Sequence, residues 1–189
     1  MKKPEIPENE KERLKELKEY SILDTLPEQE YEEITQLASF ISETPISLIT
    51  LIDENRQWFK SHLGLEIKQS SRNDSFCAHA INDKDNILII PDSRKDDRFH
   101  DNPWVLNEPK IIFYAGIPLI SSNGYPLGTL CVIDSQPREL NDKQLKALKS
   151  LSNQLIKLFE KQKQSIQLEK LNKELKNQND SLNDFARVA

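Results

Sequence analysis

Apolar residues recur early in the chain at the spacing of a helix. Between Pro27 and Pro45 they return every three or four positions, which predicts a helix with one buried face. Its apolar positions are Tyr31, Ile34, Leu37, Ala38 and Ile41. Pro27 and the glutamates after it favour a helix start, which we expect Asp24 or Thr25 to cap. The charged segment 8–19 carries two leucines on one side and predicts a short surface helix.

Short apolar runs bounded by turn residues predict a largely antiparallel sheet. Residues 53–55 form a turn between the first two runs, and the Asn-Gly pair in residues 122–124 is a strong hairpin signal between the last two. The expected strands are 46–52, 57–62, 87–90, 111–121 and 126–134. Residues 75–81 predict a short helix that begins at Asp74 or Ser75.

A long polar connection separates the third and fourth expected strands. Residues 92–110 are rich in charge and contain Pro103 and Pro109, so we expect an exposed loop with one helical turn at most. Loops of this length without regular structure are unusual in compact domains and tend to be functional.

A single long helix is predicted after Pro137. Asn141 or Asp142 can cap it, and the rest of the chain contains neither Gly nor Pro. The buried side of its first half comprises Leu145, Leu148, Leu151, Leu155 and Leu158. Such a helix is roughly 65 Å long, whereas a domain of about 120 residues has a radius of gyration near 14 Å. The helix must therefore protrude from the domain.

Past Lys161 the apolar positions narrow to a coiled-coil seam, with Gln178 in one core slot. A helix this polar needs a partner, most simply a second copy in a parallel homodimer. The seam is out of phase with the buried side of the first half, which places a break or stutter at residues 162–166. We expect the dimer seam of the terminal helices to comprise Leu155, Leu168, Leu171, Leu175, Leu182 and Phe185.

Composition excludes several classes of protein. With 26 basic and 31 acidic residues the net charge is -5, so we expect no nucleic-acid binding through a basic surface. The strongly apolar residues 46–52 fall far short of the roughly 20 residues of a membrane helix, and the N-terminus lacks the apolar part of a secretory signal. A soluble, cytoplasmic protein without membrane insertion is expected. Cys77 and Cys131 are too few for a disulfide framework and fit buried thiols in a reducing compartment.

Five segments carry a more specific pattern: residues 22–25 (ILDT), 56–61 (RQWFKS), 75–81 (SFCAHAI), 113–119 (FYAGIPL) and 127–134 (LGTLCVID). In this order they closely resemble the GAF domains of bacterial sensor proteins. The resemblance covers about residues 10–158 and implies an α+β fold. In that fold a central antiparallel sheet of five or six strands has the N- and C-terminal helices on one face and a ligand cavity on the other. It divides the chain into a tail and helix (1–19), a sensory domain (20–140) and a signalling helix (141–189).

GAF domains usually precede an output domain. Residues 184–189 (DFARVA) resemble the opening of the dimerisation and phosphoacceptor helix of histidine kinases, where Ser-His-Asp-Leu follows. We therefore expect a non-catalytic module that passes a small-molecule or redox signal through its C-terminal helix to a downstream kinase domain of a two-component system. The alternatives are a structural dimerisation module whose coiled coil simply frays here, an input to a cyclic-di-GMP enzyme, and a redox enzyme such as a methionine sulfoxide reductase.

Cys77 and His79 suggest a catalytic dyad or a metal site, because thiolate and imidazole suit both. Residues two apart on a helix point in different directions, and the spacing offers no second ligand pair. We therefore expect Cys77 to be packed and His79 to be hydrogen-bonded or to line a pocket, with no catalytic residue, metal or cofactor. Ala78 between them departs from the bilin-attachment pattern of some GAF domains, and Asp53-Glu54 lacks the rest of their cyclic-nucleotide signature.

The resemblance relates residues 92–109 to the segment that folds over the ligand cavity. Arg98 and Phe99 can cover a small acidic or aromatic ligand, although Arg98 can equally pair with Asp92 or Asp101. Trp58 can line a pocket or pack within its strand. The expected ligand-binding residues, for a small molecule still to be identified, are Trp58, Phe76, Cys77, His79, Asp92, Arg98, Phe99, Tyr114 and Cys131.

Overall fold

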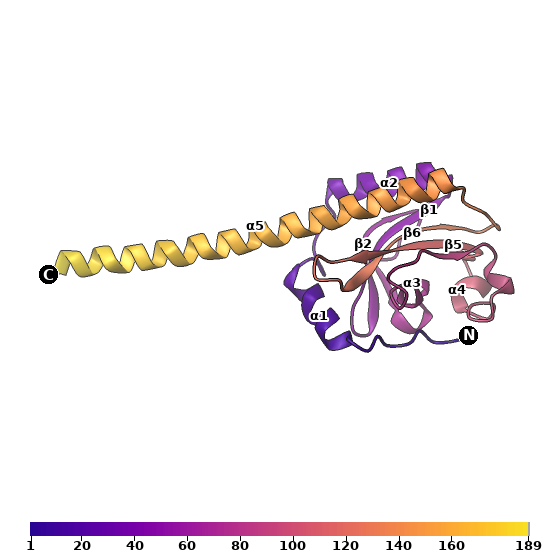
Figure 1. Ribbon diagram of the computed structural model, residues 1–189, viewed down its shortest axis with the longest axis horizontal. Coiled ribbons are helices and arrows are strands. Elements are labelled where there is room, and N and C mark those ends of the chain that lie inside the picture. The colour runs from indigo at the N-terminus through magenta and orange to yellow at the C-terminus, as the bar shows by residue number, and fades with distance from the viewer. Residues whose placement is uncertain (189) are drawn as a thin grey trace.

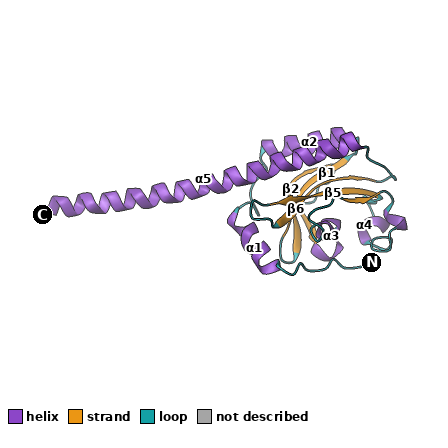
Figure 2. Ribbon diagram, in the orientation of Figure 1, coloured by secondary structure: helices purple, strands orange, loops and turns teal. Residues whose placement is uncertain are grey.

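The computed structural model describes residues 1–188, with side chains for residues 1–181. One antiparallel sheet forms its centre (Figure 2). Its strand order is β3-β2-β1-β6-β5-β4. The strands are β1 (Ile46–Ile52), β2 (Arg56–Leu63), β3 (Gln69–Ser71), β4 (Leu88–Ile90), β5 (Phe113–Ile120) and β6 (Pro126–Asp134). The predicted α+β class and the central sheet are confirmed, and β3 is an edge strand that the apolar pattern missed.

Helices cover both faces of the sheet. They are α1 (Glu10–Glu19), α2 (Gln29–Ser42), α3 (Phe76–Ala80), α4 (Pro103–Leu106) and α5 (Asp142–Val188). In Figure 1, α2 and α5 lie along one face, α3 and α4 lie on the other, and α5 continues far beyond the domain. None of the helices within residues 1–188 has an apolar stretch long enough to cross a membrane.

The two central strands, β1 and β6, are buried along their whole length. Successive side chains of a strand point to opposite faces, so each strand supplies two separate cores. Leu130 and Val132 of β6 belong to the core beneath α2 and α5, whereas Cys131 and Ile133 belong to the core beneath α3 and α4. One strand thereby separates the two cores by the thickness of its backbone.

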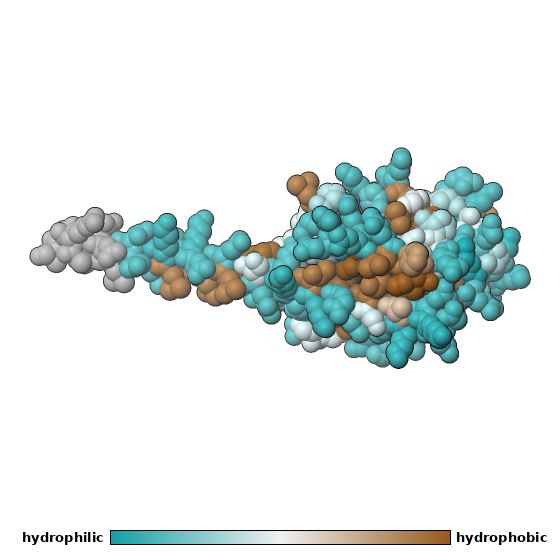
Figure 3. Space-filling view, turned by 90° about the horizontal axis from the view of Figure 1, so that it is seen from above, coloured by the Kyte–Doolittle hydropathy of each residue, from teal (hydrophilic) through white to brown (hydrophobic). Residues whose placement is uncertain are grey.

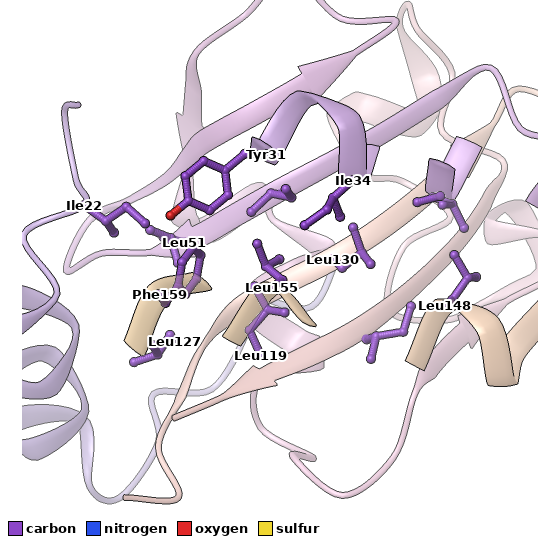
Figure 4. Packing of buried hydrophobic residues seen from close by; sticks show 14 of the residues in the cluster. Ile22, Tyr31, Ile34, Leu51, Leu119, Leu127, Leu130, Leu148, Leu155 and Phe159 are labelled. Atoms are coloured by element: carbon purple, nitrogen blue, oxygen red, sulfur yellow. The ribbon is translucent and has the colours of Figure 1, made fainter. Parts of the chain in front are cut away.

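The first half of α5 is packed against the sheet (Figure 4). Its fully buried side chains are Leu148, Leu155 and Phe159, and Ser152 between them is nearly so, which gives steps of four, three and four residues along one helix face. Phe159 also meets Tyr31 of α2, with ring centroids 5.7 Å apart. The expected seam residue Leu155 thus belongs to the core of a single chain and is not available to a second one.

The N-terminal helix is part of the same core. Leu17 and Tyr20, at the end of α1, are buried with the sheet residues that contact α2 and α5. The Arg13 side chain is also fully buried, and its guanidinium donates to the Glu10 carboxylate at 2.7 Å. The predicted surface helix is therefore integrated into the domain by its apolar end.

Helix starts agree with the sequence in two cases and differ in one. Ser75 caps α3, and Asn141 and Gln144 form a reciprocal capping box at the start of α5. Helix α2 instead begins after Glu28, because Asp24 pairs with Arg56 and the Thr25 hydroxyl donates to the Ile22 carbonyl. Leu37 was expected to face the core but is 49% exposed.

Residues 92–110 are more ordered than an exposed loop. They contain a short 3-10 turn at Ser93–Lys95 and the helix α4. Phe99, Asn102 and Val105 from this segment are buried. The apolar side chains among its many charges anchor the segment on the sheet, so its charged residues lie on the outer side.

The second half of α5 projects from the domain. Leu168, Leu171 and Leu175 are 60%, 55% and 62% exposed, while the side chains of the other expected seam residues, Leu182 and Phe185, lie outside the described part of the chain. Helix α5 runs without interruption through the expected break at residues 162–166. Where the projecting half begins, polar residues of α5 bind the N-terminal helices. The Tyr20 hydroxyl donates to Glu160 at 2.5 Å, the Tyr31 hydroxyl donates to Gln162 at 3.0 Å, and Lys163 pairs with Glu19 at 2.9 Å.

We predict that Leu155→Ala lowers the free energy of unfolding by about 3 kcal/mol, because it opens a cavity between α5 and the sheet. Leu175→Ala is the matched control, and in dilute protein it should change this free energy by less than about 0.5 kcal/mol. Urea titration followed by circular dichroism measures both. Equal losses in the two variants would contradict the assignment of Leu155 to the core of a single chain.

Candidate functional site

A small cavity lies on the sheet face opposite α2 and α5. Its volume is about 30 Å³, which is room for about two water molecules. Most of its lining is apolar, and among its polar residues Gln57 and Ser75 form a hydrogen-bonded cluster with Cys77. The lining residues are Leu48, Gln57, Phe59, Leu65, Ile67, Ser70, Asp74, Ser75, Phe76, Cys77, Trp104, Ile111, Tyr114 and Ile133.

The alternation of the strands aims these side chains at the cavity. Gln57 and Phe59 are two apart in β2 and share one face, which also receives Tyr114 from β5 and Ile133 from β6. Helix α3 closes the cavity above them. Ser75 fixes the start of α3, because its hydroxyl accepts from the Ala78 backbone N–H at 3.0 Å.

Hydrogen bonds connect Ser75, Gln57 and Tyr114 with Cys77. The Ser75 hydroxyl donates to Gln57 Oε1, and Gln57 Nε2 donates to Cys77 Sγ at 3.3 Å. The Tyr114 hydroxyl donates to the same sulfur at 3.3 Å. Cys77 Sγ lies 3.8 Å from Cys131 Sγ, and both thiols are free and buried. A thiol is a weak acceptor, so donors that converge on it favour its ionised form.

This environment separates the acidities of the two thiols. Burial alone raises the pKa of Cys77, but hydrogen bonds from Cys131, Thr129, Thr50 and Tyr114 outweigh burial and hold this pKa below its usual range. Burial and the neighbouring Cys77 raise the pKa of Cys131 well above its usual range. Burial likewise raises the pKa of Tyr114, so its hydroxyl keeps its proton. Cys77 is the thiol that ionises first.

Gly116 allows Tyr114 to reach the thiols. The Tyr114 ring lies over Gly116, and a Cβ at that glycine would sit 2.1 Å from the tyrosine hydroxyl. Any larger residue at this position would displace the phenol. The glycine in the FYAGIPL segment therefore serves the site as well as the strand.

Residues 92–110 cover the cavity from outside, as the resemblance implied. Trp104 of this segment and Ile111, the residue directly after it, line the cavity. Phe99 stacks on Phe76 with ring centroids 4.1 Å apart and 10° between the planes. Asn102 Nδ2 donates to the Asp74 carbonyl at 3.0 Å, which ties this segment to the start of α3.

Five of the expected ligand-binding residues lie together at this site. Phe76, Cys77 and Tyr114 line the cavity, Cys131 contacts Cys77 from β6, and Phe99 supports Phe76. Their identities came from the family pattern, and the structure brings them within one cluster.

The other four do not line the cavity, although the His79 ring meets Phe99 edge-on with ring centroids 4.8 Å apart. Trp58 packs in the core beneath α2 and α5, because its neighbours Gln57 and Phe59 take the cavity face. Asp92 pairs with Arg94 at 2.8 Å on the surface. Arg98 pairs with Asp96 at 2.7 Å, a partner that sequence reasoning did not consider. His79 Nε2 lies 3.1 Å from the Lys2 carbonyl oxygen.

Sequence reasoning also missed Gln57 and Ser75, although both stand in the matched segments. Gln57 is a polar residue within a buried strand, which is a signal for a functional network, and it was overlooked beside the larger Trp58. Within the side chains that the structure describes, no three His, Cys, Asp or Glu residues gather as a metal site requires.

The fold and the site identify the class of domain. The pattern that defines the GAF domain family matches residues 26–157. The chain belongs to this family, and the core described above extends that stretch on both sides, through α1 and to Phe159 of α5.

One characterised relative is a cyclic di-GMP phosphodiesterase of Pseudomonas aeruginosa. It is 44% identical over 138 residues, which cover 73% of this chain and 23% of the relative. The chain thus spans less than a quarter of that protein's length.

Two solved structures confirm the fold at low sequence identity. The GAF domain of the Acinetobacter phosphoenolpyruvate-protein phosphotransferase has a TM-score of 0.59 and 16% identity, over 80% of this chain and 93% of that one. The type II free methionine-R-sulfoxide reductase of Thermoplasma acidophilum has a TM-score of 0.58 and 13% identity, over 77% and 96%.

We predict that Tyr114→Phe raises the pKa of Cys77 toward the ordinary thiol value of about 8.5, because a donor to the thiolate is lost. The ultraviolet absorbance of the thiolate as a function of pH, taken as a difference against Cys77→Ser, measures this midpoint. Tyr125→Phe removes a phenol hydroxyl outside the cavity lining and should leave the midpoint unchanged. The hydrogen-bond account is wrong if both variants titrate like the native chain.

Proposed function

We propose that this chain is a sensory GAF module without catalytic turnover, which converts a change in its cavity into a change at the exposed half of α5. The observation that carries the proposal is the two-faced strand β6. Cys131 and Ile133 face the cavity side, while their neighbours Leu130 and Val132 contact the core that seats α5. A displacement of β6 on the cavity side therefore reaches the seat of α5 within one residue.

The transmission would be a shift between two seatings of α5. A signal biases such an equilibrium only if it stabilises the two states unequally, and a tenfold bias requires about 1.4 kcal/mol. Repacking a few of the buried contacts of Leu148, Leu155 and Phe159 is on that scale.

A parallel homodimer is the arrangement in which a moving α5 carries information. Figure 3 shows apolar side chains along the outer surface of the helical layer and again along the projecting half of α5. Phe40 of α2 is 82% exposed, and Leu168, Leu171 and Leu175 are exposed on α5 at helical spacing. A second copy would cover both, and it would give the polar second half of α5 the partner that an isolated helix of this kind lacks.

We predict that Leu175→Asp dissociates the dimer, because it places a carboxylate in the proposed seam. Size-exclusion chromatography with light scattering should give the mass of two chains for the native protein and of one chain for the variant. Asn172→Asp adds the same charge outside the seam and should remain dimeric. A native chain that is monomeric across the accessible concentration range would sink the proposed dimer.

Two kinds of output domain are supported by separate observations. Residues 184–189 favour a histidine kinase, because they resemble the opening of its phosphoacceptor helix. The relative in Pseudomonas aeruginosa favours a cyclic-di-GMP enzyme, although the match covers only 23% of that protein's length. We propose the kinase, since the resemblance of residues 184–189 is to a helix of the output domain itself.

The coding sequence beyond Ala189 tests the output. We expect Ser-His-Asp-Leu followed by an ATP-binding domain, and with it autophosphorylation that responds to the state of the sensory cavity. A cyclic-di-GMP phosphodiesterase domain would select the second candidate, and a stop codon would contradict both outputs in this chain.

A further inference from the structure

The cavity is small compared with the sites that bind metabolites. Drug-sized ligands occupy about 300–1,000 Å³, whereas this cavity measures about 30 Å³. A molecule with two heavy atoms fills it. Cys77 is one of the polar residues that line it, and its sulfur accepts hydrogen bonds from Gln57 and Tyr114.

The second sulfur is placed to react with the first. Cys77 belongs to α3 and Cys131 to the centre of β6, 54 positions apart in sequence, yet their Sγ atoms are 3.8 Å apart. A disulfide needs a separation of about 2.05 Å, so the sulfurs must approach by less than about 2 Å. Both thiols are free, and their burial keeps out large oxidants and the thiols of other proteins.

The two cysteines differ in the way a reacting pair requires. Cys77 lines the cavity and accepts hydrogen bonds from Gln57 and Tyr114, which support a thiolate. Cys131 sits beside it in the sheet, and its thiol keeps its proton. Their positions make Cys77 the sulfur that attacks the oxidant and Cys131 the resolving sulfur. The lower pKa of Cys77 agrees with this assignment.

We propose that Cys77 and Cys131 form a peroxide-reactive thiol pair, in which hydrogen peroxide enters the cavity, oxidises Cys77 and leaves a disulfide between α3 and β6. This inference rests on the proposed sensory function for its biological meaning, because it names the signal that the cavity receives. The partly buried side chains Leu65, Ile67 and Trp104 form the outer wall through which a molecule of this size would pass.

The reaction balances with peroxide as the oxidant. The Cys77 thiolate attacks one peroxide oxygen, the O–O bond breaks, and the departing hydroxide takes up the thiol's proton as water, which leaves a sulfenic acid. Cys131 then attacks the sulfenic sulfur, its S–H proton leaves with the hydroxyl group as a second water, and the S–S bond forms. Two thiols lose two electrons in total, and one peroxide becomes two waters.

The disulfide would act on the strand that seats α5. It would draw α3 toward β6 at Cys131 and remove the thiolate to which Gln57 and Tyr114 donate. Leu130 and Val132, on either side of Cys131, hold the opposite core. Oxidation of the pair would thereby change the packing of β6 against the first half of α5.

The test uses the full chain, reduced and then treated with stoichiometric hydrogen peroxide. After denaturation in an alkylating reagent, we expect a protein lighter by two hydrogen atoms with both thiols protected, a linked Cys77 and Cys131 peptide pair in a non-reducing digest, and full reversal by dithiothreitol. In Cys131→Ser, dimedone added together with the denaturant should trap the sulfenic acid on Cys77. In Cys77→Ser, oxidation of Cys131 should be at least about tenfold slower.

Cys77→Ala and Cys131→Ala repeat the series, and thermal melts of all variants confirm that they fold. The proposal is overturned if both thiols of the folded native chain survive peroxide that oxidises glutathione under the same conditions. It is also overturned if the disulfides join separate chains, or if Cys131 reacts equally fast without Cys77.

Hydrogen exchange of α5 separates this inference from the sensory function. Disulfide formation together with altered protection of residues 142–160 supports both. Disulfide formation with unchanged protection supports the thiol chemistry and refutes its role in signalling. An intact sensory response without any disulfide refutes the thiol pair alone.

Discussion

Strand β6 is buried on both of its faces, and this constraint organises the molecule. A strand at the centre of a sheet offers alternate side chains to two sides, and both sets must be removed from water. In this chain one side is covered by α2 and α5, and the other by α3 and the segment that contains α4. The helix that leaves the domain and the cavity that Cys77 lines are therefore neighbours across a single layer of backbone.

The core beneath α3 and α4 contains several buried polar side chains beside the cavity. Gln57 and Ser75 lie among apolar side chains, and each is acceptable there because its polar atoms have partners. The Thr50 and Thr129 hydroxyls bond each other at 3.1 Å across β1 and β6 in the same way. A network of this kind restrains the side chains around Cys77 more tightly than packing alone does.

Local patterns predicted most of the fold and part of the site. β1 and β6 were expected at their observed bounds, because apolar runs between turn residues depend on nearby sequence alone. The sequence left open whether Trp58 lines a pocket or packs in the core, because the choice of face depends on which residues of β2 meet α2, and that information lies in tertiary contacts. The family pattern identified Cys77, Cys131 and Tyr114, but their mutual distances depend on a fold that joins α3, β5 and β6.

Leu155 shows why one helix can be interpreted in two ways. Its spacing from Leu148 suits packing on a sheet and packing in a coiled coil equally, because both bury one side of a 3.6-residue helix. The change of phase near residue 162 is the distinguishing feature. Before this residue α5 packs on the sheet of its own chain. At the change of phase, polar residues of α5 bind Tyr20, Tyr31 and Glu19 of the N-terminal segment. The phase changes where the intrachain contacts end, so a stutter is not needed to explain it. Because α5 is one uninterrupted helix, a shift of its seat on β6 moves the exposed leucines with it.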